Sequence, residues 1–280
     1  KLYWELLLNY SQNDKVFTMM KGSAGSGKSY AFQQFVITTC LQEKHKWLCF
    51  RAIASTISDS IEAVFIEILD EWDIKYTWNK SRHSIKFPNG SIILMKGLDN
   101  VEKIKSIASV SNIWIEELTE LQDVTNDPQS VIDQLLFRLR GKSAIGKGRG
   151  KIYGAFNPID ESNFVKKYFY DIKRNDINYS NTTFRDNGFL GDHQIYLDKF
   201  EYLKTVNMNM YRVYIFGDWG KLDLSNLMYV GFDFKKHVID RFNYDEHKDL
   251  YLSFDENVNP YCSLLLSQKQ GNQITIFDEI

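Results

Sequence analysis

The sequence has little cysteine, and the three residues present, Cys40, Cys49 and Cys262, form no C-x-x-C pair. An odd number of cysteines without metal-ligand spacing argues against a disulfide framework and against zinc, and it favours a reducing compartment. No apolar stretch approaches the roughly 18 residues of a membrane span, and the N-terminus has no signal-peptide hydrophobic region. We therefore expect a soluble, intracellular protein with unpaired thiols.

The chain also lacks a charge excess of either sign, since 34 basic and 36 acidic side chains leave a formal net charge of −2. Any contact with nucleic acid must then come from a local basic patch. A hydrophobic content of 44% in 280 residues is enough for one large core or two smaller ones, and the length favours about two domains. Because the chain begins at Lys1 and ends in a strand-like run, we expect it to be part of a longer protein.

Residues 22–29 read GSAGSGKS, a complete G-x-x-x-x-G-K-[ST] phosphate-binding loop (Walker A). A strand-like run at 16–20 precedes it, and apolar residues at helical spacing follow between 30 and 40. Glycines let a loop point its backbone N–H groups at a polyphosphate. The alternative is an ordinary glycine-serine turn. The predicted nucleotide-binding residues are Gly22, Ser23, Ala24, Gly25, Ser26, Gly27, Lys28 and Ser29, with Lys28 on the β and γ phosphates and the Ser29 hydroxyl on Mg²⁺.

Acidic side chains follow the apolar run at 113–115, where Glu116 and Glu117 end a predicted buried strand in the Walker B arrangement. Parallel strands deliver such carboxylates to the edge of the sheet that receives the phosphate loop. We predict that Glu116 holds the Mg²⁺ shell and that Glu117 orients and deprotonates the attacking water. The alternative is two surface glutamates that begin a helix. A third run, KIYGAFNP at 151–158, predicts a short strand that ends in Asn157 and is stopped by Pro158. The Asn157 amide is then placed to sense the γ-phosphate or the water, whereas Asn-Pro alone is a turn signal.

Other patterns predict the elements around these motifs. The run at 47–50 is typical of a buried strand, and 61–72 has helical spacing. Alternation between 76 and 94 around a PNGS turn predicts a hairpin that decorates the sheet. The stretch from 160 to 219 is expected to be rich in helices.

The motifs GSAGSGKS, WIEELTE, GAFNP, TTFRDNGFL and YRVYIFGDWG, taken in this order, resemble the large terminase subunit of tailed double-stranded DNA bacteriophages. The resemblance implies an α/β fold: an ATPase domain over 1–219, with a P-loop NTPase (RecA-like/ASCE) parallel-sheet core at about 1–160 and a helical subdomain at about 160–219. A linker at 220–249 and the first strands of an RNase H-like nuclease at 250–280 would follow.

The resemblance also implies a function. The protein would be an ATP-driven DNA-packaging motor that uses Mg²⁺ and translocates double-stranded DNA into a capsid. The full-length chain would in addition cut concatemeric DNA with a nuclease that uses two Mg²⁺ or Mn²⁺ ions. The implied partners are the portal protein and the small terminase subunit, the implied assembly is a homo-oligomeric ring, and the implied location is the host cytoplasm. Asn157 falls in the family's coupling motif.

This chain departs from the family pattern at two places. Many terminases have an arginine where this loop has Ala24, so a finger cation must come from elsewhere; Lys105 is one candidate, and Arg138 and Arg140 are others. The alternative for each of them is a solvated surface charge. Asp255 matches the first nuclease metal ligand, although the usual glycines beside it are missing, and Asp278 and Glu279 are weaker matches. We expect the remaining ligands beyond residue 280, so this piece should not cleave DNA.

A basic stretch without acids, RLRGKSAIGKGRGK, runs from 138 to 151. A cationic loop of this kind could follow a DNA backbone without reading bases, which makes Lys142, Lys147 and Arg149 candidate DNA contacts. A solvated connection between two strands is an equally good interpretation.

Three other functions are compatible with a phosphate loop. A helicase-like DNA translocase without nuclease is the nearest alternative, and a structural ring component that binds nucleotide without hydrolysis is another. A small GTPase or nucleotide kinase is disfavoured, because Asn79 and Lys80 are followed by Ser81 and Arg82 instead of the guanine-reading N/T-K-x-D.

Overall fold

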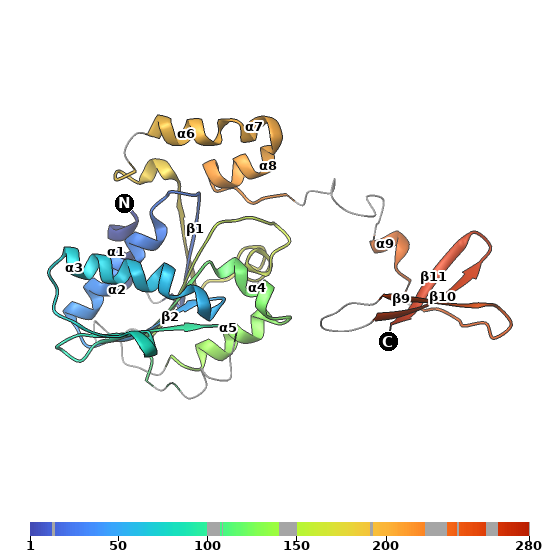
Figure 1. Cartoon of the computed structure of the whole chain (residues 1–280), viewed down its shortest axis with the longest axis horizontal. Coiled ribbons are helices and arrows are strands. Elements are labelled where there is room, and N and C mark those ends of the chain that lie inside the picture. The colour runs from blue at the N-terminus through green and yellow to red at the C-terminus, as the bar shows by residue number, and fades with distance from the viewer. Residues whose placement is uncertain are drawn as a thin grey trace. The chain divides into compact units, whose positions relative to one another are not determined.

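The protein is described from a computed structural model that covers residues 1–12, 15–99, 107, 109–139, 150–190, 193–221, 234–239, 241–255 and 263–279 (Figure 1). It divides into two compact units, Lys1–Leu222 and Asp223–Ile280.

The first unit is built on an eight-stranded sheet with the order β3-β4-β5-β2-β6-β7-β1-β8. Every neighbouring pair from β5 to β8 is parallel, whereas β4 runs antiparallel to both β3 and β5. The predicted parallel core is therefore corrected to a mixed, mostly parallel sheet. The strands are β1 (Phe17–Gly22), β2 (Lys46–Arg51), β3 (Thr77–Asn79), β4 (Ser84–Lys86), β5 (Ile92–Gly97), β6 (Asn112–Glu116), β7 (Lys151–Phe156) and β8 (Ile177–Thr182).

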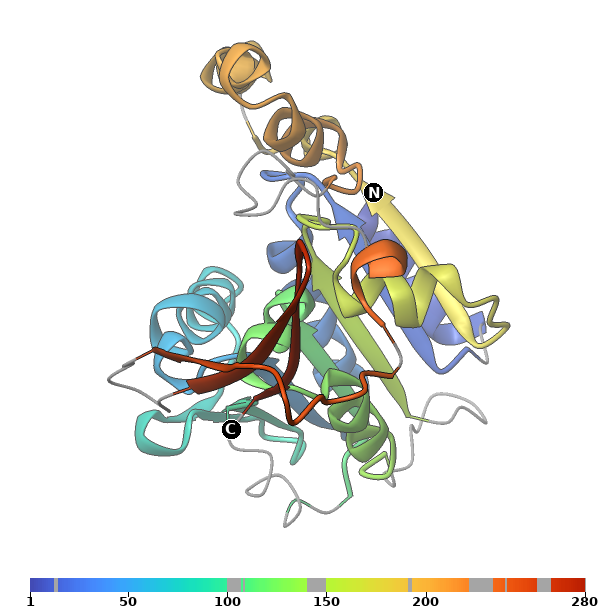
Figure 2. The same cartoon turned by 90° about the vertical axis from the view of Figure 1, so that its right-hand side faces the viewer.

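Helices cover both faces of this sheet (Figures 1 and 2). Successive residues of a strand point to opposite faces, so Trp47 and Cys49 of β2 enter one hydrophobic cluster while Leu48 and Phe50 enter the other. The first cluster contains residues of α1, α2 and α3, and the second contains residues of α4 and α5. The helices are α1 (Leu2–Gln12), α2 (Lys28–Gln42), α3 (Ala63–Glu71), α4 (Leu121–Val124), α5 (Pro128–Leu136), α6 (His193–Glu201), α7 (Leu203–Val206) and α8 (Met208–Tyr211).

Two elements differ from the sequence prediction. The PNGS turn does join two antiparallel strands, but β5 also pairs in parallel with β2 and so belongs to the main sheet instead of decorating it. The stretch predicted to be rich in helices contains β8, which pairs in parallel with β1 at the sheet edge. Its sequence, INYSNT, is polar because one face of an edge strand meets solvent.

The chain after β8 forms a small helical layer. Its own hydrophobic cluster contains Phe184, Leu203, Tyr211 and Ile215. Figure 1 shows α6, α7 and α8 beyond the carboxyl end of β1, which is the end that leads into the phosphate loop.

The second unit contains a three-stranded antiparallel sheet with the order β11-β10-β9. Because β9 and β11 both run antiparallel to β10, their carboxyl ends share one edge. Asp255 and Glu279 are the last residues of these two strands. The elements of this unit are α9 (Phe234–His237), β9 (Leu250–Asp255), β10 (Ser263–Gln270) and β11 (Gln273–Glu279).

The described cysteines, Cys40 and Cys49, are buried and form no disulfide, as predicted, and Cys262 lies outside the described residues. Among the described helices, none has the length and apolar character needed to cross a membrane.

Candidate phosphate-binding site

The loop at 22–29 joins the carboxyl end of β1 to the first residue of α2, as predicted. Gly25 and Gly27 have φ angles of 68° and 75°, in the left-handed region that favours glycine. Gly27 is the N-cap of α2, and no side chain caps the helix. The backbone N–H groups of its first turn are thus left for another acceptor, and together with the positive end of the helix they make this turn suited to an anion.

Lys28 lies inside the loop with its ammonium group hydrogen-bonded on several sides. Its Nζ donates to Asn157 Oδ1 at 2.7 Å, to the Ser23 carbonyl oxygen at 3.0 Å and to Ser26 Oγ at 3.3 Å. Burial lowers the pKa of Lys28 to about 8, although the charges of Glu117 and Glu116 act in the opposite direction. A buried cation with a lowered pKa in a loop of this geometry is well prepared to receive an anion.

Glu116 ends β6 beside the start of α2. Its side chain is buried and accepts a hydrogen bond from the Ser29 side chain, while Oε2 has no hydrogen-bond partner among the described residues. Burial raises the pKa of Glu116, and the Ser29 hydroxyl and the charge of Arg51 lower it. An unpartnered carboxylate oxygen next to a serine hydroxyl fits Mg²⁺, which takes one or two protein oxygens and completes its shell with water and phosphate. No group of three or more His, Cys, Asp or Glu residues suited to a metal occurs in the described parts of the chain.

Glu117 follows in a left-handed conformation, with φ 49° and ψ 53°. This conformation is uncommon for a residue with a Cβ and turns the chain sharply at the end of the strand. The carboxylate accepts a hydrogen bond from the Asn157 backbone N–H. Burial raises the pKa of Glu117, whereas the positive charges of Lys28 and Arg51 lower it. The strand ends thus bring Lys28, Glu117 and Asn157 together, as predicted.

Arg51 is a site residue that the sequence analysis missed. It ends β2, the neighbour of β6, and its side chain is only 14% exposed. Its Nη2 lies 3.3 Å from Glu120 Oε2, and its positive charge acts on both Glu116 and Glu117. The available signal was its position directly after an apolar run, because the carboxyl ends of parallel strands meet at one edge.

The segment after β8 contacts the outside of the loop, which the sequence analysis also missed. The Phe184 backbone N–H donates to Ser23 Oγ at 2.8 Å, and Asn187 Nδ2 donates to the Gly25 carbonyl oxygen at 2.9 Å. A Cβ added at Gly25 would lie 2.6 Å from the hydroxyl oxygen of Tyr196 in α6. The RDN motif therefore belongs to the wall of the site.

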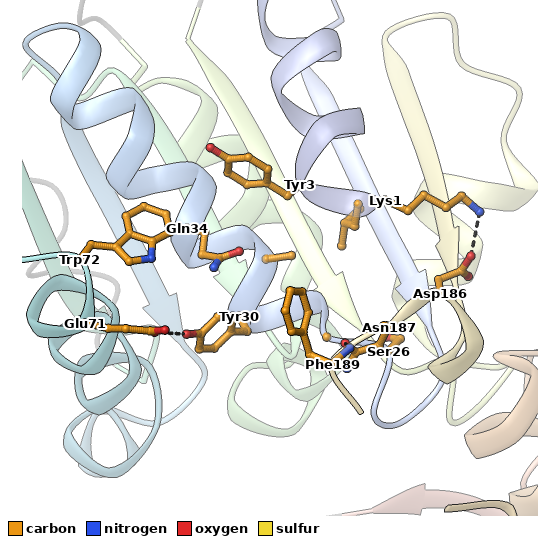
Figure 3. A pocket seen from close by; sticks show the side chains of 14 residues that line it. Lys1, Tyr3, Ser26, Tyr30, Gln34, Glu71, Trp72, Asp186, Asn187 and Phe189 are labelled. Carbon is orange, nitrogen blue, oxygen red and sulfur yellow. Dashed lines mark hydrogen bonds and ion pairs between the residues drawn. The ribbon is translucent and has the colours of Figure 1, made fainter. Parts of the chain in front are cut away.

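A cavity of about 630 Å³ opens beside Ser26 and Gly27 (Figure 3). Aromatic rings of Tyr30, Trp72 and Phe189 and the amide of Gln34 line it. Tyr30 donates its hydroxyl hydrogen to Glu71 Oε2 at 2.9 Å, and the ring of Phe189 is fully exposed. Flat apolar surfaces with a few polar groups, next to a phosphate loop, suit the base of a nucleotide.

Several predicted residues are not among the described residues of this site. Arg138 lies in the turn that follows α5, half-buried. Asp255 ends β9 in the second unit, and its side chain is outside the described part of the chain. The candidates that lie wholly outside the described residues are Lys105, Arg140, Lys142, Lys147 and Arg149.

Comparison with known proteins adds three findings. The family model described as phage terminase large subunit matches residues 14–218. The PBSX phage terminase large subunit of Bacillus subtilis is 27% identical over an alignment of 228 residues that covers 74% of this chain and 50% of that protein. The large subunit terminase of Bacillus phage SPP1 is 25% identical over an alignment of 279 residues that covers 88% of this chain and 64% of that protein. This chain thus spans between half and two thirds of these relatives.

Solved structures agree with this fold. The large terminase of a thermophilic bacteriophage matches with a TM-score of 0.64 and 15% identity, over 100% of this chain and 67% of that one. The same protein has been solved in complex with ADP and with ATP-γ-S, at TM-scores of 0.61 and 0.60 with 15% and 16% identity. These two structures cover 99% of this chain and 68% of theirs. At such identities the likeness shows a shared fold.

Proposed function

The chain belongs to the phage terminase large subunit family, and from this premise we propose that it is the ATP-hydrolysing part of a motor that packages double-stranded DNA into a capsid. The observation that supports this most is the meeting of Lys28, Glu117 and Asn157 at one loop. These are a cation for phosphate, a general base for water and an asparagine that contacts both, Lys28 through its side-chain oxygen and Glu117 through its backbone N–H. The complexes of the thermophilic phage terminase with ADP and ATP-γ-S agree with a nucleotide at this fold.

In this proposal the chain holds ATP along the edge of the sheet. The backbone N–H groups of 22–29 and the Lys28 ammonium bind the phosphates, and the cavity beside Tyr30 takes the base. Ser29 and Glu116 would hold Mg²⁺, which would neutralise charge on the phosphate oxygens.

Hydrolysis then depends on Glu117. Its carboxylate takes a proton from a water molecule as the water oxygen bonds to the γ-phosphorus and the bond from that phosphorus to the β-phosphate oxygen breaks. Asn157 Oδ1 accepts a hydrogen bond from Lys28, and the Asn157 backbone N–H donates one to Glu117. A phosphate that binds Lys28 therefore also affects the position of Glu117, the general base. This arrangement gives Asn157 a coupling role.

Many terminases have an arginine where this loop has Ala24, so the missing cation would come from two other places. Arg51 offers a positive charge from the same subunit, next to both glutamates. Lys105, from a neighbouring subunit of a homo-oligomeric ring, would provide the finger. The portal protein and the small terminase subunit would be the other partners in the host cytoplasm.

We also propose that the second unit begins an RNase H-like nuclease that binds Mg²⁺ or Mn²⁺. The supporting observation is the shared edge at which β9 and β11 end, with Asp255 and Glu279 as their last residues. The longer protein would cut concatemeric DNA there. A helicase-like translocase would have no such pair of acidic residues at neighbouring strand ends.

The proposed function is tested by measuring phosphate release from ATP by this chain, with and without linear duplex DNA. We expect release that depends on Mg²⁺ and increases with DNA. ATP binding without any release would contradict the motor and would favour a nucleotide-binding ring component.

Replacing Phe189 by alanine should weaken ATP binding by about 5- to 150-fold, because stacking of a base on an aromatic ring contributes about 1–3 kcal/mol. Titration of a fluorescent ATP analogue would measure this. Inorganic tripolyphosphate has no nucleotide base. Its inhibition constant, calculated from competition with the analogue and corrected for the affinity of the analogue, should therefore be the same in the wild type and in Phe189→Ala. An equal loss for tripolyphosphate would place Phe189 in phosphate binding instead.

ATP binding at pH 9 should take up close to one proton. In the nucleotide-free chain Lys28 has a pKa of about 8, so it is mostly neutral at pH 9, and the phosphates raise that pKa by their negative charge. Near pH 7 the ammonium is already charged, so this uptake should vanish. Calorimetric titrations in two buffers of different ionisation enthalpy would measure it. Lys28→Arg, which stays charged, is the control, and wild-type binding at pH 9 without uptake would contradict the prediction.

A further inference from the structure

A second cavity, of about 520 Å³, lies at the opposite edge of the sheet from the phosphate loop. Lys44, Lys46 and Lys86 line it together with Ser109 and Ser111. Within the described parts of the chain, no carboxylate lines it. We call this cavity, with these five residues, the lysine pocket.

The lysine pocket is formed by the amino ends of parallel strands. Lys46 and Ile92 are the first residues of β2 and β5, and Ser111 directly precedes β6. Lys86 ends β4, which runs in the opposite direction and therefore reaches the same edge. Because the phosphate loop follows the carboxyl end of β1, the pocket is separate from the nucleotide site.

The pocket wall is held by hydrogen bonds that do not use the lysine ammonium groups. The Lys46 backbone N–H donates to Ser111 Oγ at 3.2 Å, and the Ser111 backbone N–H donates to the Lys46 carbonyl oxygen at 2.8 Å. Ser91 fixes the turn before β5, since its hydroxyl donates to the Cys40 carbonyl oxygen at 2.8 Å. These hydrogen bonds thus fix the backbone that carries Lys46 and the turn that precedes β5.

Two of these cations are not neutralised. Lys44 and Lys86 are exposed, and neither pairs with a carboxylate of the described residues. The sequence around Lys86 contains no Asp or Glu from 74 to 98. A concave surface with several positive charges and no described acid concentrates a positive potential, which attracts a polyanion.

The basic stretch RLRGKSAIGKGRGK is attached to the fold at this edge. Leu139, just before residues 140–149, forms a bridge with Val110, and a Cβ added at Gly150, just after them, would collide with the Ser111 carbonyl oxygen. Ser111 lines the lysine pocket, and Val110 lies between it and Ser109, which lines the pocket too. The described ends of this stretch, Leu139 and Gly150, therefore lie at the same edge of the sheet as the lysine pocket.

We propose that the lysine pocket binds neighbouring backbone phosphates of the duplex DNA that the motor moves, so that DNA contacts the sheet edge opposite to ATP. This inference rests on the proposed function and adds the position at which DNA contacts the chain. Lysine ammonium groups are point charges that hold phosphate without fixed geometry, and the described lining has no arginine, asparagine or glutamine to read a base edge. Such a contact accepts any sequence.

The test replaces both exposed cations in Lys44→Gln plus Lys86→Gln. DNA affinity of the whole chain would be measured by fluorescence anisotropy with two unrelated duplexes over a series of salt concentrations. We expect at least about tenfold weaker binding to both duplexes, and a slope of log affinity against log salt that is less steep by about 2, one for each lost phosphate contact.

The matched control is Lys167→Gln plus Lys173→Gln, two exposed lysines outside the pocket. An unchanged slope in the pocket variant, or an equal change in the control, overturns the proposal. Both variants should hydrolyse ATP without DNA at the wild-type rate. A wild-type chain that does not hydrolyse ATP would contradict the proposed function, whereas intact hydrolysis with unchanged DNA binding in the pocket variant would contradict only the DNA site.

Discussion

Glu117→Gln should reduce ATP hydrolysis by about 10²–10⁴-fold, the usual contribution of a general base. Glutamine has the same shape and can still accept the hydrogen bond from the Asn157 backbone N–H, so the geometry of the site is preserved. It cannot take a proton from water. ATP affinity should be kept or increased, because one negative charge near the triphosphate is removed. Single-turnover phosphate release and equilibrium ATP binding measure the two effects separately.

The control for this variant is Glu161→Gln, which replaces an exposed glutamate and should hydrolyse ATP normally. The pH dependence gives a second check. Burial raises the pKa of Glu117, and only the ionised form accepts a proton, so the wild-type rate should fall as the pH decreases through a range above that of an ordinary glutamate. A Glu117→Gln protein with wild-type turnover would exclude this residue as the base.

The centre of the site was predictable because it depends on strand ends. Lys28 and Asn157 are 129 residues apart in the sequence and yet bond at 2.7 Å. Each follows an apolar run that the sequence identified as a strand, and parallel strands of one sheet end at the same edge. Apolar patterns therefore placed Glu116, Glu117 and Asn157 near the loop without any knowledge of strand order.

The periphery of the site could not be predicted in the same way. A single arginine after an apolar run is not a motif. Arg51 lies near Glu116 and Glu117 only because β2 is the neighbour of β6, which the sequence does not show. Asn187 reaches the Gly25 carbonyl because β8 joins the sheet beside β1 and directs the next segment over the loop. Since β8 is a polar edge strand, its sequence has no apolar run that would predict a strand of the sheet.

The fold was predicted to a similar extent. Long buried strands such as β2 and β7 are nearly continuous apolar runs, so composition identifies them. The antiparallel strands β3 and β4 have three residues each, too few for a pattern to fix their direction or pairing. The PNGS turn reverses the chain between β4 and β5, so this turn, and not the composition of the strands, determines that β4 runs antiparallel to β5.

Lys28→Met should weaken ATP binding by about 10- to 150-fold and reduce turnover by about 10²–10³-fold. The first figure corresponds to charged hydrogen bonds of about 1.5–3 kcal/mol, and the second to the loss of a donor that is aimed at developing charge. Lys21→Met is the matched control, because it removes the same side chain from the preceding strand and should leave hydrolysis intact. Binding and phosphate release would be measured as for Glu117→Gln.

The same variant also separates phosphate binding from a structural role of Lys28. Because folding lowers the pKa of Lys28 to about 8, its charge disfavours the folded state fully below pH 8, and this cost disappears between about pH 8 and the unfolded value of 10.5. The free energy of unfolding of the wild type should therefore rise relative to Lys28→Met over this range. Denaturant unfolding at pH 7 and pH 10, with and without ATP, measures this difference. Stabilisation by ATP that is as large in Lys28→Met as in the wild type would show that Lys28 does not bind the phosphates, since a ligand stabilises the folded chain only through the affinity it retains.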